Sequence, residues 1–306
     1  MSRLRARQPE EITPRLKMLL FGGAGAGKTT AALNFERAYV IDGEKGTAHY
    51  AEQIRKAGSA VFDTTDLGEV IEEVKTLISE EHDYRTVIID PVTTIWNDWI
   101  DKCEKKVGSE FGRHVTEAGK TMKRLLNLLT ALDCNVIMTA HGRIEYGDGM
   151  VKLGTTFDGF KKLDYHFDLV MEIKKQGKGA NAKRVAEVIK SRLPQHFPDG
   201  AVFPWNYGEF AKRYDATVLE RKAVPVALAT PDQLQEIKDL LHVVRLEEGL
   251  VEKWFSKANV DAWADMPAET IAKCIQYVKG RLPGNPHAGE NGTAKPERRI
   301  VPVGQE

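Results

Sequence analysis

Eight consecutive residues, Gly22 to Thr29, combine four glycines with a lysine and a threonine at fixed spacing. They fit the pattern G-x-x-x-x-G-K-[ST] at every position. Glycines let the backbone curl so that successive N–H groups point inward, and a helix N-terminus adds about half a positive charge. Such a loop binds phosphate groups, with Lys28 reaching the β- and γ-phosphates and the Thr29 hydroxyl binding Mg²⁺. The predicted nucleotide-binding residues are Gly22, Gly23, Ala24, Gly25, Ala26, Gly27, Lys28, Thr29 and Thr30.

The segments that flank this loop agree with that interpretation. Lys17–Phe21 predicts a short buried strand, and residues 30–35 predict the first turns of a helix. A strand, the loop and a helix in this order are the context in which the pattern binds a nucleoside triphosphate. We therefore expect ATP and Mg²⁺ as cofactors.

A second apolar strand, Thr86–Asp90, ends in a carboxylate. At the carboxyl end of a parallel strand near the phosphate loop, Asp90 would hold Mg²⁺ through water. The alternative is an aspartate that only caps the following helix. The loop upstream favours the metal role.

Hydrolysis also needs a group that orients the attacking water. The segment Tyr39–Glu44 ends another predicted strand, and Glu44 is the candidate catalytic carboxylate, with Asp42 in reserve. The alternative is a solvated loop carboxylate. The strand that ends at His141 offers an imidazole that could report the γ-phosphate, although a structural histidine would look the same.

Two cations, Lys190 and Arg192, lie two residues apart at the end of the last predicted strand and should face one side. Cations in this position could stabilise the transition state at a neighbouring subunit's triphosphate. An edge strand that carries charge to avoid aggregation is the alternative.

Composition restricts the class of protein. The chain has 306 residues, and Lys+Arg and Asp+Glu each number 44, so any anion-binding surface must be local. The three cysteines are far apart, which argues against a disulfide framework or a zinc site. The basic N-terminus lacks the apolar region of a signal peptide, and no apolar run approaches membrane-spanning length. We expect a cytoplasmic protein that does not bind membranes.

Apolar strands alternate with helical stretches from residue 16 to about residue 214, which predicts an α/β fold with a mostly parallel sheet. The predicted strands are Lys17–Phe21, Ala38–Asp42, Ser59–Asp63, Thr86–Asp90, Asn135–His141, Phe167–Lys174 and Arg184–Ser191. The predicted helices are Lys28–Glu36, His49–Lys56, Leu67–Glu81 and Val115–Leu132. The last two strands, joined by a Gly-rich turn at residues 176–181, should form an antiparallel pair.

The character of the sequence changes near residue 220. Thr230, Pro231 and Gln233 predict a helix start with a capping box, and apolar stripes predict two further helices near residues 250–257 and after Pro267. We predict a flexible arm at 1–14, an ATPase core at 15–222, a linker at 223–229, a small three-helix domain at 230–282 and a disordered tail at 283–306.

Two segments carry cations and aromatic residues that could contact nucleic acid. Gly142–Lys162 predicts a Gly-rich loop that contains four cations, with Phe157 and Phe160 available to stack on bases. Lys102–Lys123 is the other segment. Each segment also contains acids, and a charged face is often only solvated.

The order of these motifs resembles the RecA-like recombinase core, over about residues 16–215. The strings IDGEKGT and VIKSRLPQHFP narrow the resemblance to shortened, phage-encoded RecA-like ATPases of single-strand annealing and recombination. The resemblance implies that Glu44 is the catalytic glutamate and His141 the polar switch, in place of the glutamine of bacterial RecA. It implies that Lys190 and Arg192 bridge subunits and that Gly142–Lys162 is a DNA-binding loop.

These observations predict an ATPase that binds single-stranded DNA as a homo-oligomer, with ATP at subunit interfaces, and promotes annealing or homologous recombination. A single-strand-binding protein is a further candidate partner. The alternatives are a nucleotide-gated replication loader, a helicase-like ATPase and a P-loop kinase of small molecules. The kinase needs an arginine-rich lid, and none follows the fourth predicted strand.

Overall fold

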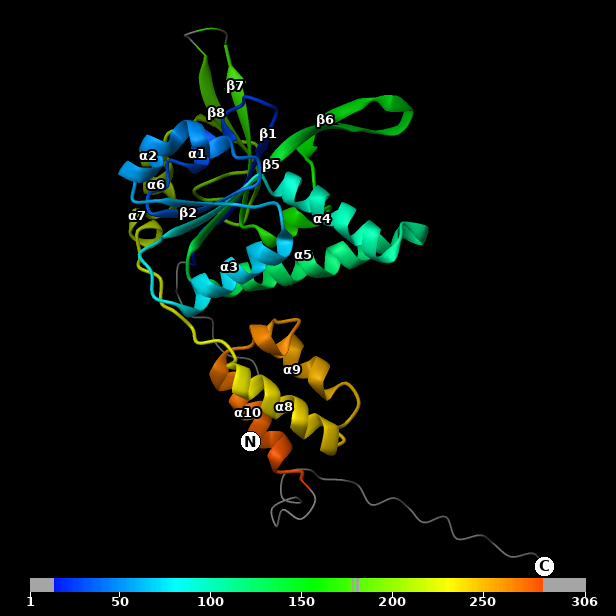
Figure 1. The fold of residues 1–306 in the computed structure, drawn as a ribbon. Helices are drawn as coiled ribbons and strands as arrows, with labels where there is room; N and C mark the ends of the chain where they lie inside the picture. Colours follow the sequence, from blue (N-terminus) through cyan, green and yellow to red (C-terminus); the bar gives the residue numbers. More distant parts are fainter. Residues whose placement is uncertain (1–13, 178, 180–181, 283–306) are drawn as a thin grey trace, which may run out of the picture. The chain divides into compact units, whose positions relative to one another are not determined.

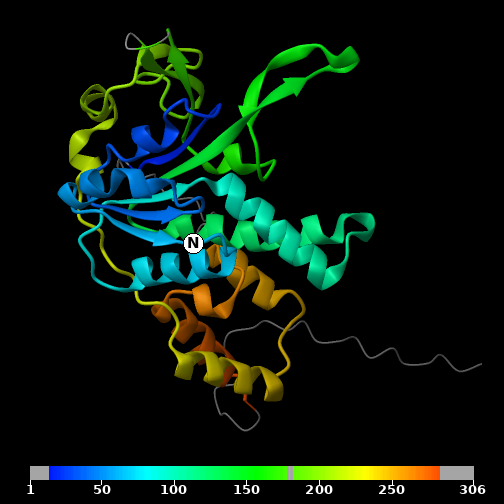
Figure 2. The same cartoon turned by 45° about the horizontal axis from the view of Figure 1, so that its top comes forward.

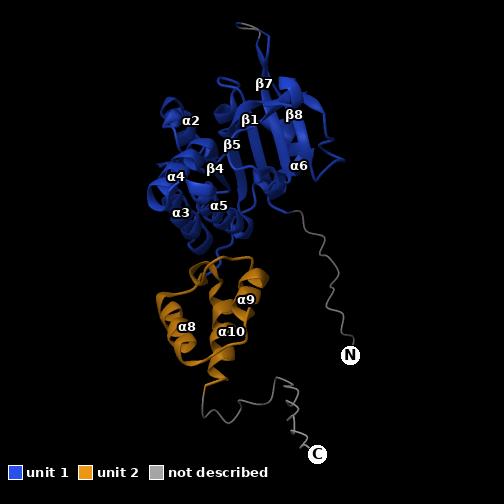
Figure 3. Ribbon diagram, turned by 90° about the vertical axis from the view of Figure 1, so that its right-hand side faces the viewer, with its two compact units in different colours: residues 1–227 blue, residues 228–306 orange. Residues whose placement is uncertain are grey.

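The computed structural model describes residues 14–177, 179 and 182–282. The predicted arm before Pro14 and the predicted tail from residue 283 lie outside the described residues. The chain divides into two compact units, residues 1–227 and 228–306, coloured separately in Figure 3. The first contains the sheet and the second contains three α-helices among its described residues.

Nine strands of the described chain form one sheet. They are β1 (Lys17–Gly22), β2 (Ala38–Asp42), β3 (Ala60–Asp63), β4 (Thr86–Asp90), β5 (Asn135–Tyr146), β6 (Lys152–Phe157), β7 (Leu169–Gln176), β8 (Lys183–Ser191) and β9 (Val202–Pro204). The order is β3-β2-β4-β5-β1-β7-β8-β9, and β6 pairs with β5 outside this path. The six strands from β3 to β7 run parallel, and apart from the partly exposed edge strand β3 their apolar sequences suit strands that are buried on both faces. The predicted fold class, an α/β fold with a mostly parallel sheet, is confirmed.

Helices cover both faces of the sheet. Those of the first unit are α1 (Lys28–Ala32), α2 (Ala51–Lys56), α3 (Leu67–Ser79), α4 (Val92–Val107), α5 (Arg113–Ala131), α6 (Tyr207–Tyr214) and α7 (Ala216–Leu219). Buried residues of α1, α2, α6 and α7 share one core with alternate residues of the strands. The helices α3, α4 and α5 pack together on the opposite face (Figure 2). Among the described helices, none is long and apolar enough to cross a membrane.

Three local predictions were wrong. The first helix ends at Ala32 instead of Glu36, because the chain turns at residues 33–37 to enter β2. The helix α4 was missed, although its buried positions Val92, Ile95, Trp96 and Cys103 follow a helical period. The segment Gly142–Lys162 is not a loop.

Strand β5 continues past His141 to Tyr146 and pairs antiparallel with β6. We call this hairpin, residues 142–157, the ribbon; it projects beyond the sheet (Figure 1). The predicted antiparallel pair of β7 and β8 is confirmed, but β9 follows β8 and lies at the edge of the sheet.

The second unit contains α8 (Pro231–Val243), α9 (Leu250–Ala258) and α10 (Ala268–Lys279). Thr230 and Gln233 form the predicted capping box at the start of α8, so this prediction is confirmed. Ile237, Met266 and Ile271 are fully buried members of a separate core. The unit therefore has a hydrophobic core of its own.

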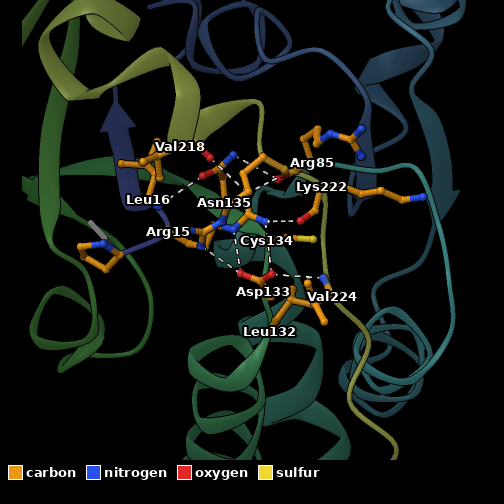
Figure 4. A network of polar contacts seen from close by, with 12 residues as sticks. Arg15, Leu16, Arg85, Leu132, Asp133, Cys134, Asn135, Val218, Lys222 and Val224 are labelled. Atoms are coloured by element: carbon orange, nitrogen blue, oxygen red, sulfur yellow. Dashed lines mark hydrogen bonds and ion pairs between the residues drawn. The ribbon is translucent and has the colours of Figure 1, made fainter. Parts of the chain in front are cut away.

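A buried arginine ties the end of the first unit to its sheet (Figure 4). Arg15 is 5 % exposed, and its guanidinium forms an ion pair with Asp133 at 2.8 Å. It also donates to the carbonyls of Val218, Arg221 and Lys222 at 3.1, 2.7 and 2.9 Å. Burial alone would raise the pKa of Asp133, but Arg15 holds it below its usual value. One side chain thus fixes the chain segment that follows α7.

Replacing this guanidinium should destabilise the first unit. We expect Arg15→Met to lower the free energy of unfolding by about 3 kcal/mol, because three carbonyls lose their donor and Asp133 loses the shorter of its two ion pairs. Urea unfolding followed by circular dichroism measures the change. The control is Arg55→Met on the exposed face of α2, which should stay within about 0.5 kcal/mol. Equal stability of the two variants would contradict a structural role for Arg15.

Candidate nucleotide-binding site

The carboxyl ends of four parallel strands meet at one edge of the sheet, as expected for a ligand site in an open α/β fold. A hollow of about 470 Å³ opens there. Its lining residues are Gly22, Ala24, Gly25, Lys28, Thr29, Glu44, Asp90, Pro91, His141 and Gly142. The fold thus brings together residues that lie up to 120 positions apart in the sequence.

The phosphate loop has the backbone conformation that its glycines allow. Gly27 has φ = 100°, a left-handed value that disfavours any side chain, and it precedes the first residue of α1. The Lys28 ammonium donates to the carbonyls of Gly22 and Gly23 at 3.0 and 3.2 Å. Burial lowers the pKa of Lys28, while the charges of Asp90 and Glu44 oppose this shift. Of the other predicted loop residues, Thr30 contacts the hydroxyl of Tyr50 at 3.2 Å, outside the lining of the hollow.

Asp90 is a buried carboxylate at the end of β4, with 6 % of its surface exposed. Burial raises its pKa, and hydrogen bonds from the hydroxyls of Thr139 and Thr29 partly offset this. These hydroxyl and carboxylate oxygens fit Mg²⁺, which binds few protein oxygens and keeps water and phosphate as its other ligands. Thr139 was missed because it lies in an apolar strand.

The carboxylate of Glu44 lies at the mouth of the hollow and has two partners. The Thr94 hydroxyl donates to Oε1 at 2.7 Å, and His141 Nε2 is 3.1 Å from the same oxygen. Asp42, the reserve candidate, is 2 % exposed and instead accepts hydrogen bonds from Thr47 and from the backbone N–H of Glu44. Burial would raise the pKa of Asp42, but these bonds lower it. Asp42 therefore shapes the turn that presents Glu44.

The base of the ribbon is joined to this site by a closed set of hydrogen bonds. The N–H of His141 donates to the Thr93 hydroxyl at 2.9 Å, and that hydroxyl donates to the Asp158 carbonyl at 2.8 Å. The N–H of Asp158 donates back to the His141 carbonyl at 2.7 Å. A Cβ on Gly142 would lie 2.8 Å from the carbonyl carbon of Gly22, so only glycine fits there.

The two aromatic residues predicted to stack on bases are engaged inside the first unit. Phe157 packs against Phe21 at 6.3 Å between ring centroids, and Phe160 packs against Trp96 at 5.2 Å. Both rings are partly buried and each has one intramolecular ring contact, so base stacking by these two residues stays a prediction. The exposed aromatic residue of the ribbon is Tyr146, which is 52 % exposed.

Lys190 and Arg192 are not near the hollow of their own chain. They lie beside the first residue of β7, at the opposite edge of the sheet. The Lys190 ammonium donates to the carbonyls of Asp164 and Phe167 at 2.6 and 2.9 Å, and burial followed by the charge of Arg192 lowers its pKa. Arg192 pairs with Asp168 at 2.9 Å.

A cation that the sequence did not single out lies against the phosphate loop. Arg184 is an exposed residue near the start of β8, and a Cβ on Gly27 would lie 2.0 Å from its Nε. Its side chain thus occupies the space beside Gly27 that a larger residue would need. No ion pair of Arg184 occurs among the described residues. The spacing of residues in the sequence could not predict this contact, because Gly27 and Arg184 come together only through the pairing of strands in the sheet.

The parallel sheet, with Lys28 and Thr29 at the head of α1 and Asp90 on a nearby strand, defines a P-loop nucleoside triphosphatase. A family model described as an AAA domain matches residues 15–193, more than half of the chain. The chain therefore belongs to the AAA domain family, and it is a P-loop ATPase that uses ATP, typically with Mg²⁺.

No curated protein matches the sequence. Among solved structures, the chain is similar to the KaiC-like protein PH0186 from the hyperthermophilic archaeon Pyrococcus horikoshii OT3. The identity is 17 %, the match covers 63 % of this chain and 85 % of that chain, and the TM-score is 0.40.

The position of Arg184 generates a test of the site. We expect Arg184→Ala to weaken ATP binding about tenfold, because a guanidinium beside the phosphate loop attracts the polyphosphate. Isothermal titration calorimetry measures the change. Lys183→Ala removes a neighbouring exposed cation and should leave the affinity within about twofold. Similar affinities of both variants and the unaltered protein would exclude contact between Arg184 and the nucleotide.

Proposed function

We propose that this ATPase binds single-stranded DNA through the ribbon and that its nucleotide state controls the binding. The biological role that fits best is annealing or homologous recombination, as in the phage-encoded RecA-like ATPases that the sequence resembles. One observation carries the proposal: His141, at the joint between the sheet and the ribbon, contacts the candidate catalytic carboxylate of Glu44 at 3.1 Å.

The contact supports coupling between the nucleotide site and the ribbon, because His141 is part of both. Its imidazole faces the hollow, and its backbone closes the hydrogen-bonded base of the ribbon with Thr93 and Asp158. A γ-phosphate in the hollow would compete for the groups that now hold Glu44. A change at His141 would then alter the ribbon base, and by linkage a ligand on the ribbon would alter the site equally.

The surface of the ribbon is suited to a flexible polyanion with apolar bases. Five apolar side chains are exposed on it by 45–77 %: Ile144, Tyr146, Met150, Val151 and Leu153. Exposed cations, Arg143 and Lys152, lie on the same hairpin. Stacking on an aromatic ring together with phosphate contacts is the usual chemistry of single-strand binding.

We propose further that the protein acts as a homo-oligomer with ATP between subunits. Lys190 and Arg192 would serve the neighbour's triphosphate, and exposed Tyr165, Ile189 and Val202, on nearby segments of the same part of the sheet, would join the interface. This role requires both cations to exchange their present partners for phosphate oxygens. A single-strand-binding protein is the additional partner expected in such a pathway.

The catalytic role of Glu44 predicts a separation of binding from turnover. We expect Glu44→Gln to lower the ATPase rate at least about a hundredfold, because the amide cannot accept a proton from water, and to leave ATP affinity within about threefold. A phosphate-release assay measures the rate. Glu52→Gln on the exposed surface of α2 is the matched control and should hydrolyse ATP normally. Unchanged turnover in the Glu44 variant would remove this carboxylate from the mechanism.

Coupling predicts that ATP tightens the binding of single-stranded DNA. We expect the affinity for a labelled oligodeoxythymidine to rise about tenfold with Mg²⁺ and ATP, measured by fluorescence anisotropy. Arg143→Ala with Lys152→Ala should weaken binding and lower the slope of log K against log salt by about one to two.

The control for this experiment removes Arg55 and Lys56, an exposed arginine and lysine on α2, and should bind DNA normally. Equal affinities with and without ATP would contradict the coupling. Hydrolysis that depends on a small acceptor and not on DNA would favour a kinase. Binding that requires another replication protein would favour a loader.

A further inference from the structure

The helical unit carries a groove of its own between α9 and α10. The hollow has a volume of about 420 Å³, within the range of sites that take a small ligand or a few side chains. Its walls are the rings of Trp254 and Tyr277, with Ala258 and the buried Cys274 beside them. Thr270 and two lysines complete the lining.

The aromatic walls are already engaged with each other and with a cation. The rings of Trp254 and Tyr277 meet edge to face at 5.3 Å between centroids, and the Arg281 guanidinium carbon lies 3.6 Å from the centroid of Tyr277. A planar base would have to displace Arg281 to stack on that side of Tyr277. Arg281 thus competes with a nucleobase for one face of Tyr277, whereas the aromatic surface that lines the hollow can pack against a bulky apolar side chain.

The charge of the lining has one sign. Lys257 on α9 and Lys273 on α10 are both exposed, and no acidic residue lines the groove. Neither lysine forms an ion pair within the part of the chain that the structure describes. An apolar hollow between two unpaired ammonium groups attracts a ligand that has an apolar side chain flanked by carboxylates.

We propose that this groove binds an acidic peptide segment of another protein, with one aromatic or large aliphatic side chain of the peptide packed in the hollow against the joined rings of Trp254 and Tyr277. Carboxylates of the peptide pair with Lys257 and Lys273. The site is independent of the ATPase site and gives the helical unit a recruiting function.

The test uses the full chain and a fluorescent decapeptide of aspartate and glutamate with one phenylalanine. Anisotropy should show saturable binding that is at least tenfold weaker for the double variant Lys257→Glu, Lys273→Glu. The matched control, Lys238→Glu with Arg245→Glu, reverses two exposed charges outside the groove and should bind as the unaltered protein does.

Two further measurements separate the proposal from its rivals. Replacing the phenylalanine of the peptide by serine should abolish saturation, and equal binding of both peptides would overturn the apolar part of the site. If the groove variant loses affinity for oligodeoxythymidine and keeps its affinity for the peptide, the groove is a nucleic-acid site and the proposal fails. Equal peptide binding by the groove variant and the control variant would also overturn it.

Discussion

The close approach of three backbones at Gly22 is the constraint on which the nucleotide site depends. A Cβ on Gly22 would lie 2.3 Å from the Ile173 carbonyl oxygen, and a Cβ on Gly142 would lie 2.8 Å from the carbonyl carbon of Gly22. Backbone segments packed this closely cannot move independently, so a displacement of one segment moves its neighbours. The phosphate loop therefore starts from a point fixed between β7 and the base of the ribbon, and the position of Lys28 follows from it.

Charge burial is the second feature of the site. Asp90 and Lys28 both have pKa values shifted toward their neutral forms by burial, so each charged group lies in an environment that partly opposes its charge. Thr29, Thr139 and the loop carbonyls satisfy these groups in the protein alone. Burying these charged groups lowers the stability of the fold but strengthens binding. The groups are already desolvated when a ligand of opposite charge arrives, so the ligand gains the full electrostatic attraction.

The two surfaces that we propose for partners are the ribbon and the groove of the helical unit. The ribbon extends from the end of β5, and the groove of the helical unit has walls from α9 and α10. A rigid sheet holds the catalytic groups in place at its edge. Segments that project from the sheet, or that form a separate unit, can bind other molecules without disturbing those groups. Under these proposals, the ATPase core would supply the chemistry and the two surfaces would supply the recognition.

The sequence by itself determined the features that depend on neighbours along the chain. The spacing of Gly22 to Thr29, the acid after each of two apolar strands, and the capping box at Thr230 depend on a few consecutive residues, so pattern alone reveals them. The mostly parallel sheet followed from the alternation of such segments. The missed helix α4 also had a readable period, masked by its polar second half.

Only the tertiary structure decided which distant residues meet. The ribbon depends on pairing between β5 and β6, and its glycines and polar residues resemble a loop in sequence. Arg184 reaches Gly27, and Lys190 lies away from its own nucleotide site, because antiparallel pairing with β7 fixes where each residue of β8 falls. The contact of Arg184 with Gly27 also needs the pairing of β1 with β7, whose partner residues lie more than a hundred positions apart, and local sequence carries no record of that register.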